Sequence, residues 1–269
     1  MEKHDILKYV QQQMVSTAER LRTLTHDRTG NPYPKRYIYF GLEKHLRGFI
    51  QKDEQSIRSI VVTGLRGVGK TTVMAQLCAK SLSDDSKRIT LFISLEEVVQ
   101  VLNITLTDVL DAFQNIIGEQ LYKTDQQIFL FIDEVQKDPK WGAVLRTLWE
   151  NNKNIFIFCT GSSAVELQTN ADLVRRFLFE KLPPLNFGEY EMIKNKVNPI
   201  AGLKQNLNSA IYHSQTPQGG FERLKELEGD INKYWSKVDR ADVDYFLKVG
   251  TLPYALSSPH ETLVNASIS

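Results

Sequence analysis

Apolar runs and helical stripes alternate along the first two thirds of the chain. Near-continuous apolar segments predict five strands, at residues 59–63, 88–94, 128–132, 154–160 and 178–182. Between them, apolar residues recur every three or four positions, which is the spacing of a helix with one buried face. Strands that are apolar on both faces and separated by helices indicate a parallel sheet covered on both sides. The pattern therefore predicts an α/β fold with three layers, αβα.

The same patterns divide the chain into four parts. Residues 1–35 hold a helix at 5–25 and a linker broken by two prolines, and residues 36–190 hold the alternating strands and helices. Residues 191–256 lack strand patterns and predict a small, lid-like helical subdomain. The polar tail, 257–269, is expected to be poorly ordered. The helices expected after residue 35 are 42–50, 70–80, 107–121, one opening at 137–141, 164–168, 203–213, 221–238 and 242–249, with a loop at 214–220.

The first helix has two interpretations. Its apolar stripe fits a helix that packs on the main domain, and it also fits a helix that binds a partner protein. The sequence leaves both open.

The clearest chemistry follows the first predicted strand, where Gly64-Leu65-Arg66-Gly67-Val68-Gly69-Lys70-Thr71-Thr72 has the spacing G-x-x-x-x-G-K-T. The glycines let the backbone fold closely round an anion, so that successive N–H groups point at phosphate oxygens. The helix that begins at Lys70 adds unpaired N–H groups and the positive end of its dipole. Lys70 can reach the β- and γ-phosphates, and the Thr71 hydroxyl can ligate Mg²⁺. A glycine-rich turn is the alternative, but the flanking strand and helix favour a P-loop.

A second motif follows the third predicted strand, where the apolar run 128–132 ends in Asp133 and Glu134. A buried central strand would deliver both carboxylates beside the P-loop. Asp133 is then placed to hold Mg²⁺ through water, since Mg²⁺ keeps much of its hydration shell. Glu134 is placed to activate the water that attacks the γ-phosphate. The alternative is a strand that runs into an acidic turn, and the upstream P-loop favours the catalytic interpretation.

Hydroxyl side chains end the fourth predicted strand, at Thr160 and Ser162. The carboxyl ends of parallel strands form the usual ligand face of such sheets, so either hydroxyl could contact the attacking water or the γ-phosphate. The alternative is that these residues cap the helix at 164–168.

Two further features carry open alternatives. Arg175 and Arg176, just before the fifth strand, could supply positive charge to a nucleotide in a neighbouring subunit, or form an ordinary salt-bridged pair. The segment 37–40, beginning with Tyr37, could pack on adenine or belong to the core.

Composition sets limits on partners and compartment. The net charge of +1 gives no overall support for nucleic acid or a membrane surface, although a local basic patch stays open. Cys78 and Cys159 fall in a predicted helix and strand, which indicates buried reduced thiols. No apolar run approaches the roughly 20 residues that span a bilayer. The N-terminus lacks an apolar signal core. We expect no membrane partner and a cytoplasmic protein.

Together these motifs resemble prokaryotic AAA-type P-loop ATPases related to the signalling (STAND) group. The resemblance implies a sheet in the order 5-1-4-3-2, binding of ATP and ADP, hydrolysis with Mg²⁺, and a nucleotide-driven switch. Family members usually continue through a winged-helix-like part into a nuclease-like domain, and this sequence stops where that part would begin. It could be a piece of a longer protein or a natural short form. The matching segments are 64–72, 131–137, Trp141, 160–163, Arg176, 184–190 and, more weakly, 250–253.

Four functions follow as hypotheses. The first is an ATPase switch or regulator with Lys70, Thr71, Asp133 and Glu134 as the hydrolytic set and an unknown protein partner. The second is a ring-forming motor or loader on nucleic acid, which would need a homo-oligomer and an arginine supplied in trans. The third is a small-molecule kinase, for which no acceptor site is visible. The fourth is a nucleotide-binding interaction module that does not hydrolyse ATP.

Overall fold

The computed structural model describes residues 2–85, 87–161 and 171–256. The chain forms two compact units, Met1–Pro183 and Pro184–Ser269, called here the first and second units. Each is described by itself. The predicted helix at 164–168 and the tail 257–269 lie outside the described residues.

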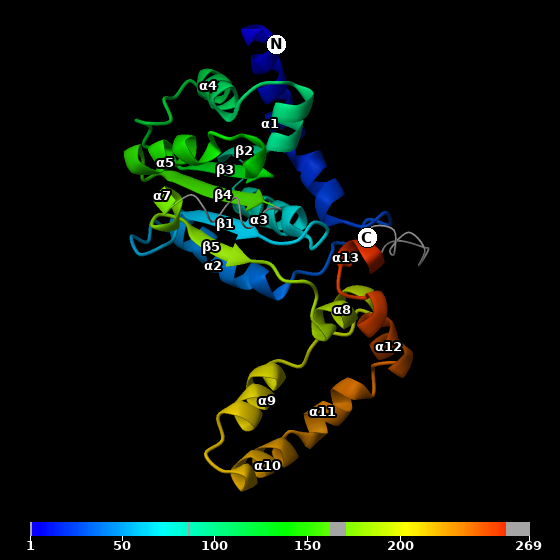
Figure 1. Cartoon of the computed structure of the whole chain (residues 1–269). Helices are drawn as coiled ribbons and strands as arrows, with labels where there is room; N and C mark the ends of the chain where they lie inside the picture. Colours follow the sequence, from blue (N-terminus) through cyan, green and yellow to red (C-terminus); the bar gives the residue numbers. More distant parts are fainter. Residues whose placement is uncertain (1, 86, 162–170, 257–269) are drawn as a thin grey trace. The chain divides into compact units, whose positions relative to one another are not determined.

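A five-stranded parallel sheet forms the centre of the first unit (Figure 1). Its strands lie in the order β2-β3-β4-β1-β5, which confirms the predicted order. All residues of the three central strands, β3, β4 and β1, are buried, as expected for strands covered on both faces. The strands are β1 (Ser59–Thr63), β2 (Ile89–Ser94), β3 (Ile128–Asp133), β4 (Ile155–Gly161) and β5 (Leu178–Lys181).

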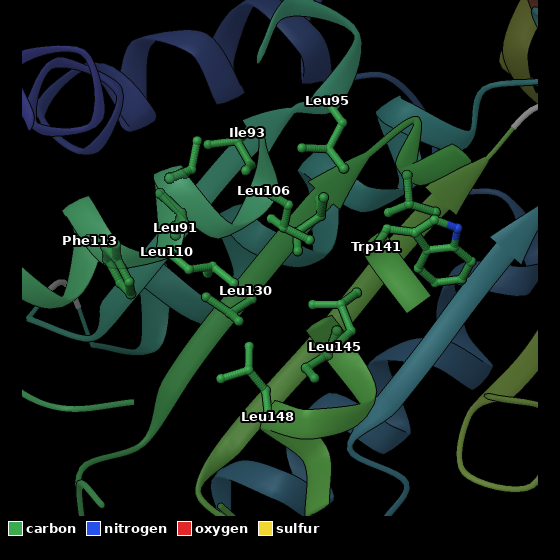
Figure 2. Packing of buried hydrophobic residues seen from close by; sticks show 14 of the residues in the cluster. Leu91, Ile93, Leu95, Leu106, Leu110, Phe113, Leu130, Trp141, Leu145 and Leu148 are labelled. Atoms are coloured by element: carbon green, nitrogen blue, oxygen red, sulfur yellow. The ribbon is translucent and has the colours of Figure 1, made fainter. Parts of the chain in front are cut away.

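Helices cover both faces of this sheet, as the three-layer prediction requires (Figure 1). On one face, leucines of the strands pack against α4 and α5 (Figure 2). On the other face, Phe49 of α2 lies 5.4 Å and 5.5 Å, between ring centroids, from Phe129 and Phe156. The α-helices that the structure describes in this unit are α1 (Lys3–Thr25), α2 (Tyr37–Ile50), α3 (Lys70–Asp84), α4 (Leu106–Ile117), α5 (Trp141–Asn151) and α7 (Ala171–Val174).

The stripe of α1 packs on the domain, which was the first of its two interpretations. Ile6 and Val10 belong to the core cluster beside the sheet, and Leu21 is buried as well. The other side of this helix is solvent-exposed, as Val15 shows at 81% exposure. The helix therefore adds an amphipathic layer to the first unit.

Some helix boundaries in the first unit differ from the prediction. The helix expected at 42–50 begins at Tyr37, because buried Tyr39 extends the apolar stripe by one turn. The helix expected to reach residue 121 ends at Ile117, because Gly118 adopts a left-handed φ of 71° and stops it. It begins at Leu106, one residue before the predicted start, after Thr105, whose side chain accepts a hydrogen bond from the Asp108 N–H.

The second unit is helical over its described residues, and one predicted helix in it was wrong. The segment 221–238 holds parts of two helices, since the first helix ends at Glu226 and the next begins at Glu228. The first of them begins at Pro217, where Thr216 caps its N–H groups, so the loop expected at 214–220 is shorter. The helices are α8 (Phe187–Lys194), α9 (Leu203–Tyr212), α10 (Pro217–Glu226), α11 (Glu228–Trp235), α12 (Arg240–Val249) and α13 (Pro253–Leu256).

Candidate functional site

The loop between β1 and α3 has the backbone geometry of an anion cradle. Gly67 and Gly69 adopt φ values of 82° and 94°, which L-residues with side chains rarely adopt. The helix α3 begins at Lys70, directly after the second of these glycines. The loop can therefore turn its N–H groups inward at the start of a 15-residue helix.

The first glycine of this loop is fixed by packing. A Cβ atom on Gly64 would lie 2.5 Å from the carbonyl oxygen of Leu182, just after β5. The N–H of Leu182 in turn donates to the carbonyl oxygen of Thr63 at 2.7 Å. The beginning of the loop therefore lies against the end of β5, and only glycine fits there.

Lys70 is held inside the loop. Its side chain is 4% exposed, and its Nζ atom donates to the carbonyl oxygens of Gly64 at 3.2 Å and Leu65 at 3.1 Å. Burial lowers the pKa of Lys70, while the carboxylates of Glu134 and Asp133 act in the opposite direction. The ammonium group is therefore already positioned inside the loop, where a phosphate oxygen would bind.

Asp133 joins the third strand to the P-loop helix. Its Oδ2 atom accepts a hydrogen bond from the Thr71 hydroxyl at 2.8 Å, and its Oδ1 atom accepts one from the Thr160 hydroxyl. Burial raises the pKa of Asp133, and the hydrogen bonds from Thr160 and Thr71 oppose that effect. Residues predicted from three separate motifs thus meet at one carboxylate.

Glu134 sits in a tight turn directly after the strand. Its φ of 53° and ψ of 49° place a non-glycine residue in the left-handed region. Its N–H donates to the Thr160 hydroxyl oxygen at 3.3 Å, and its carboxylate accepts from the Gln136 amide at 2.5 Å. Thr160 therefore contacts both acids, whereas Ser162, predicted for a similar role, lies outside the described residues.

Residues 56–191 match the AAA_14 family, an AAA domain, over half of the chain. The chain belongs to this family. It is 29% identical over 235 residues, 87% of its length, to an uncharacterised protein of Methanocaldococcus jannaschii, MJ1637. The chain spans 46% of that relative's length.

Solved structures that resemble this chain include one bacterial and one nematode protein. Domain III of the replication initiation protein DnaA from Thermotoga maritima is 17% identical, with a TM-score of 0.44 over 81% of this chain and 94% of that one. PCH-2 of C. elegans is 19% identical, with a TM-score of 0.41 over 60% of this chain and 45% of that one. Within the described residues, no helix combines the length and the apolar character needed to cross a membrane.

A residue of the first unit that the motifs did not identify also contacts the P-loop. Arg36, at the start of α2, is 5% exposed, and its NH1 atom donates to the carbonyl oxygens of Val68 in the P-loop at 2.9 Å and of Pro183 at 3.0 Å. Tyr37, predicted to contact adenine, is the first residue of α2 and is half-buried, and its role stays a prediction. The only sequence signal for Arg36 was its position beside that segment.

The arginine pair lies near the amino end of strand β1, and the P-loop follows the carboxyl end of that strand. The carbonyl oxygen of Arg176 accepts from the Ser59 hydroxyl at 2.7 Å, and Ser59 begins the strand whose far end leads into the P-loop. A strand of five residues is about 16 Å long, which separates Arg176 from the phosphate cradle of its own chain. The Arg176 guanidinium pairs with Glu150 at 2.7 Å, and Arg175 is exposed. A role for either arginine in trans stays a prediction.

The residues beside the P-loop fit a magnesium ion. The described residues hold no cluster of three or more His, Cys, Asp or Glu side chains suited to a metal. Mg²⁺ does not need one, because it commonly binds through one or two protein oxygens, several waters and the phosphates of its nucleotide. Thr71 and Asp133 present a hydroxyl and a carboxylate side by side, which is that kind of oxygen donor set.

Proposed function

We propose that this AAA domain binds ATP with Mg²⁺ and hydrolyses it to ADP and phosphate. The observation that carries the proposal is the 2.8 Å hydrogen bond between Thr71 and Asp133. It joins the helix that receives the phosphates to the strand that carries the acid pair. A glycine-rich turn without catalytic function would not need a buried carboxylate at that place.

Each residue of the site has a distinct task in this proposal. The N–H groups of residues 64–72 and the Lys70 ammonium group bind the phosphates, and Thr71 and Asp133 would hold Mg²⁺. Bound Mg²⁺ neutralises negative charge on the phosphates. Glu134 accepts a proton from the attacking water. Thr160 orients the Asp133 carboxylate by donating to its Oδ1 atom, and it holds the turn at Glu134 by accepting from that residue's N–H.

We further propose that turnover serves a switch or regulator, in the cytoplasm, acting on a protein partner that the site does not identify. As part of this proposal, we infer that the chain is related to the STAND group and that its longer relatives carry a nuclease-like domain. The support is the resemblance of the motifs and the presence of a separate helical unit after Pro183.

The test is release of phosphate from ATP by the purified chain. We expect turnover that requires Mg²⁺, loss of nucleotide binding in Lys70→Ala, and retained ATP without turnover in Glu134→Gln. Tight ATP binding without phosphate release, unchanged by Glu134→Gln, would favour a non-hydrolysing module. A phosphorylated small molecule in place of free phosphate would favour a kinase.

A ring-forming motor or loader is the second candidate. The observation that favours it is the position of Arg175 and Arg176 near the amino end of strand β1, while the P-loop of their own chain follows its carboxyl end. Charge placed there can serve a nucleotide only in another subunit. Turnover that depends on protein concentration and on these arginines would support the ring.

A further inference from the structure

Arg36 is a buried cation whose acceptors come from distant parts of the first unit. In the sequence, Arg36 follows the linker that two prolines break. It precedes its acceptors Val68 and Pro183 by 32 and 147 residues. A buried guanidinium group is costly unless its N–H groups are bonded. Here one nitrogen, NH1, donates to both carbonyl oxygens, at 2.9 Å and 3.0 Å. The two backbone segments therefore share a single donor atom.

The two acceptors belong to functionally different segments. Val68 lies between Gly67 and Gly69, in the part of the P-loop whose positive φ values shape the phosphate cradle. Pro183 is the last residue of the first unit, and Pro184 begins the second. The guanidinium group thus connects the cradle to the point where the chain leaves the sheet.

A second contact ties the same two segments together. The carbonyl oxygen of Leu182 lies so close to Gly64 that a Cβ atom there would come within 2.5 Å of it. The Leu182 N–H donates to Thr63 at 2.7 Å. The P-loop is therefore attached to the backbone after β5 at Gly64 by packing and at Val68 through Arg36.

We propose that Arg36 couples nucleotide binding in the P-loop to the backbone that follows β5. The proposal rests on the nucleotide binding proposed above, and it does not require hydrolysis. Phosphate binding turns the N–H groups of the P-loop toward the ligand, and each peptide that turns also moves its carbonyl group. When the Val68 carbonyl group moves, the Arg36 NH1 atom that donates to it moves as well. Because the same atom donates to the Pro183 carbonyl group, the two backbone positions move together. Arg36 is a positioning residue in this scheme.

Amide hydrogen exchange tests this coupling, with Mg²⁺ and ATPγS as the probe. Leu182 and Leu185 are the first amides on either side of the two prolines, and they donate to Thr63 and Thr251 respectively. In the wild-type chain we expect the probe to slow exchange at both amides by about tenfold, which is about 1.4 kcal/mol in the opening equilibrium. In Arg36→Met we expect the change at Leu185 to disappear while the probe still binds.

Arg47→Met is the matched control. Arg47 lies on the same helix, is exposed, and pairs with Glu43 at 3.1 Å, so the response at Leu185 should equal that of the wild type. Should Arg36→Met fail to fold, Arg36→Gln keeps a polar side chain that is too short to donate to both carbonyl oxygens, and it is measured in the same way.

Three outcomes separate the proposals. A wild-type chain that binds the probe without any change at Leu185 would overturn the coupling and leave the proposed function intact. A full wild-type response in a folded Arg36→Met or Arg36→Gln chain would show that another residue carries it. Failure of the wild-type chain to bind the probe would instead contradict the proposed function.

Discussion

The hydroxyl of Thr71, in the first turn of α3, lies 2.8 Å from the Oδ2 atom of Asp133, the last residue of β3. These residues are 62 positions apart in the sequence, and the parallel sheet brings them together. Both oxygens belong to the types that Mg²⁺ prefers. Their contact defines where the ion would be held.

Removing either oxygen should weaken the response to magnesium. We expect Thr71→Ala and Asp133→Asn to raise the Mg²⁺ concentration for half-maximal turnover by roughly 10- to 100-fold, the range known for residues that support metal ligands. Phosphate release measured across a magnesium titration checks this. Thr107→Ala, which removes an exposed hydroxyl from α4, should leave the titration unchanged. An unchanged titration in both site variants would contradict the assignment.

Glu134 should be needed for turnover and not for binding. We expect Glu134→Gln to lower the rate by roughly 10²- to 10⁴-fold, because an amide cannot accept the proton of the attacking water. The affinity for ATP, measured by fluorescence with a labelled nucleotide, should change little. Glu226→Gln removes an exposed carboxylate from α10 and serves as the control. A wild-type rate in Glu134→Gln would show that another group is the base.

Two glycine substitutions in the first unit should change its stability in opposite directions. Gly64→Ala would force a Cβ atom to within 2.5 Å of the Leu182 carbonyl oxygen, and we expect a loss of about 1–3 kcal/mol in the free energy of unfolding. Gly41→Ala lies in α2 with no atom within 4 Å of the added carbon, and we expect a gain of about 0.5–1 kcal/mol. Urea denaturation monitored by tryptophan fluorescence measures both. Equal effects of the two substitutions would contradict the close approach at Gly64.

The sequence could predict those parts of the site that rest on local patterns. The apolar runs located the five strands, and the G-x-x-x-x-G-K-T spacing located the P-loop. The meeting of Thr71 with Asp133 followed as well, because the carboxyl ends of parallel strands share one edge of the sheet. The strand order came from the family resemblance, since periodicity alone does not say which parallel strands are neighbours.

Two other features left no pattern in the sequence. Arg36 donates to two main-chain carbonyl groups, which leave no side-chain pattern in the sequence. The break between α10 and α11 near Leu227 falls inside a continuous helical stripe, without proline and with Gly229 only beyond the break. Helix propensity is a weak signal at such a position, and neither proline nor glycine marks the boundary.

Substitutions at Arg176 and at its ion-pair partner Glu150 distinguish a structural role of Arg176 from a catalytic role in a neighbouring subunit. Both side chains are partly exposed, at 26% and 42%, so we expect Arg176→Ala and Glu150→Gln each to cost no more than about 1 kcal/mol of stability. If Arg176 serves a neighbouring nucleotide, only Arg176→Ala should lose turnover, by roughly 10³-fold or more, with ATP binding intact. Mixing it with Glu134→Gln subunits should then restore activity, because the second variant supplies the arginine and the first the intact acid pair. Turnover that is independent of protein concentration and of both Arg175 and Arg176 would exclude the ring.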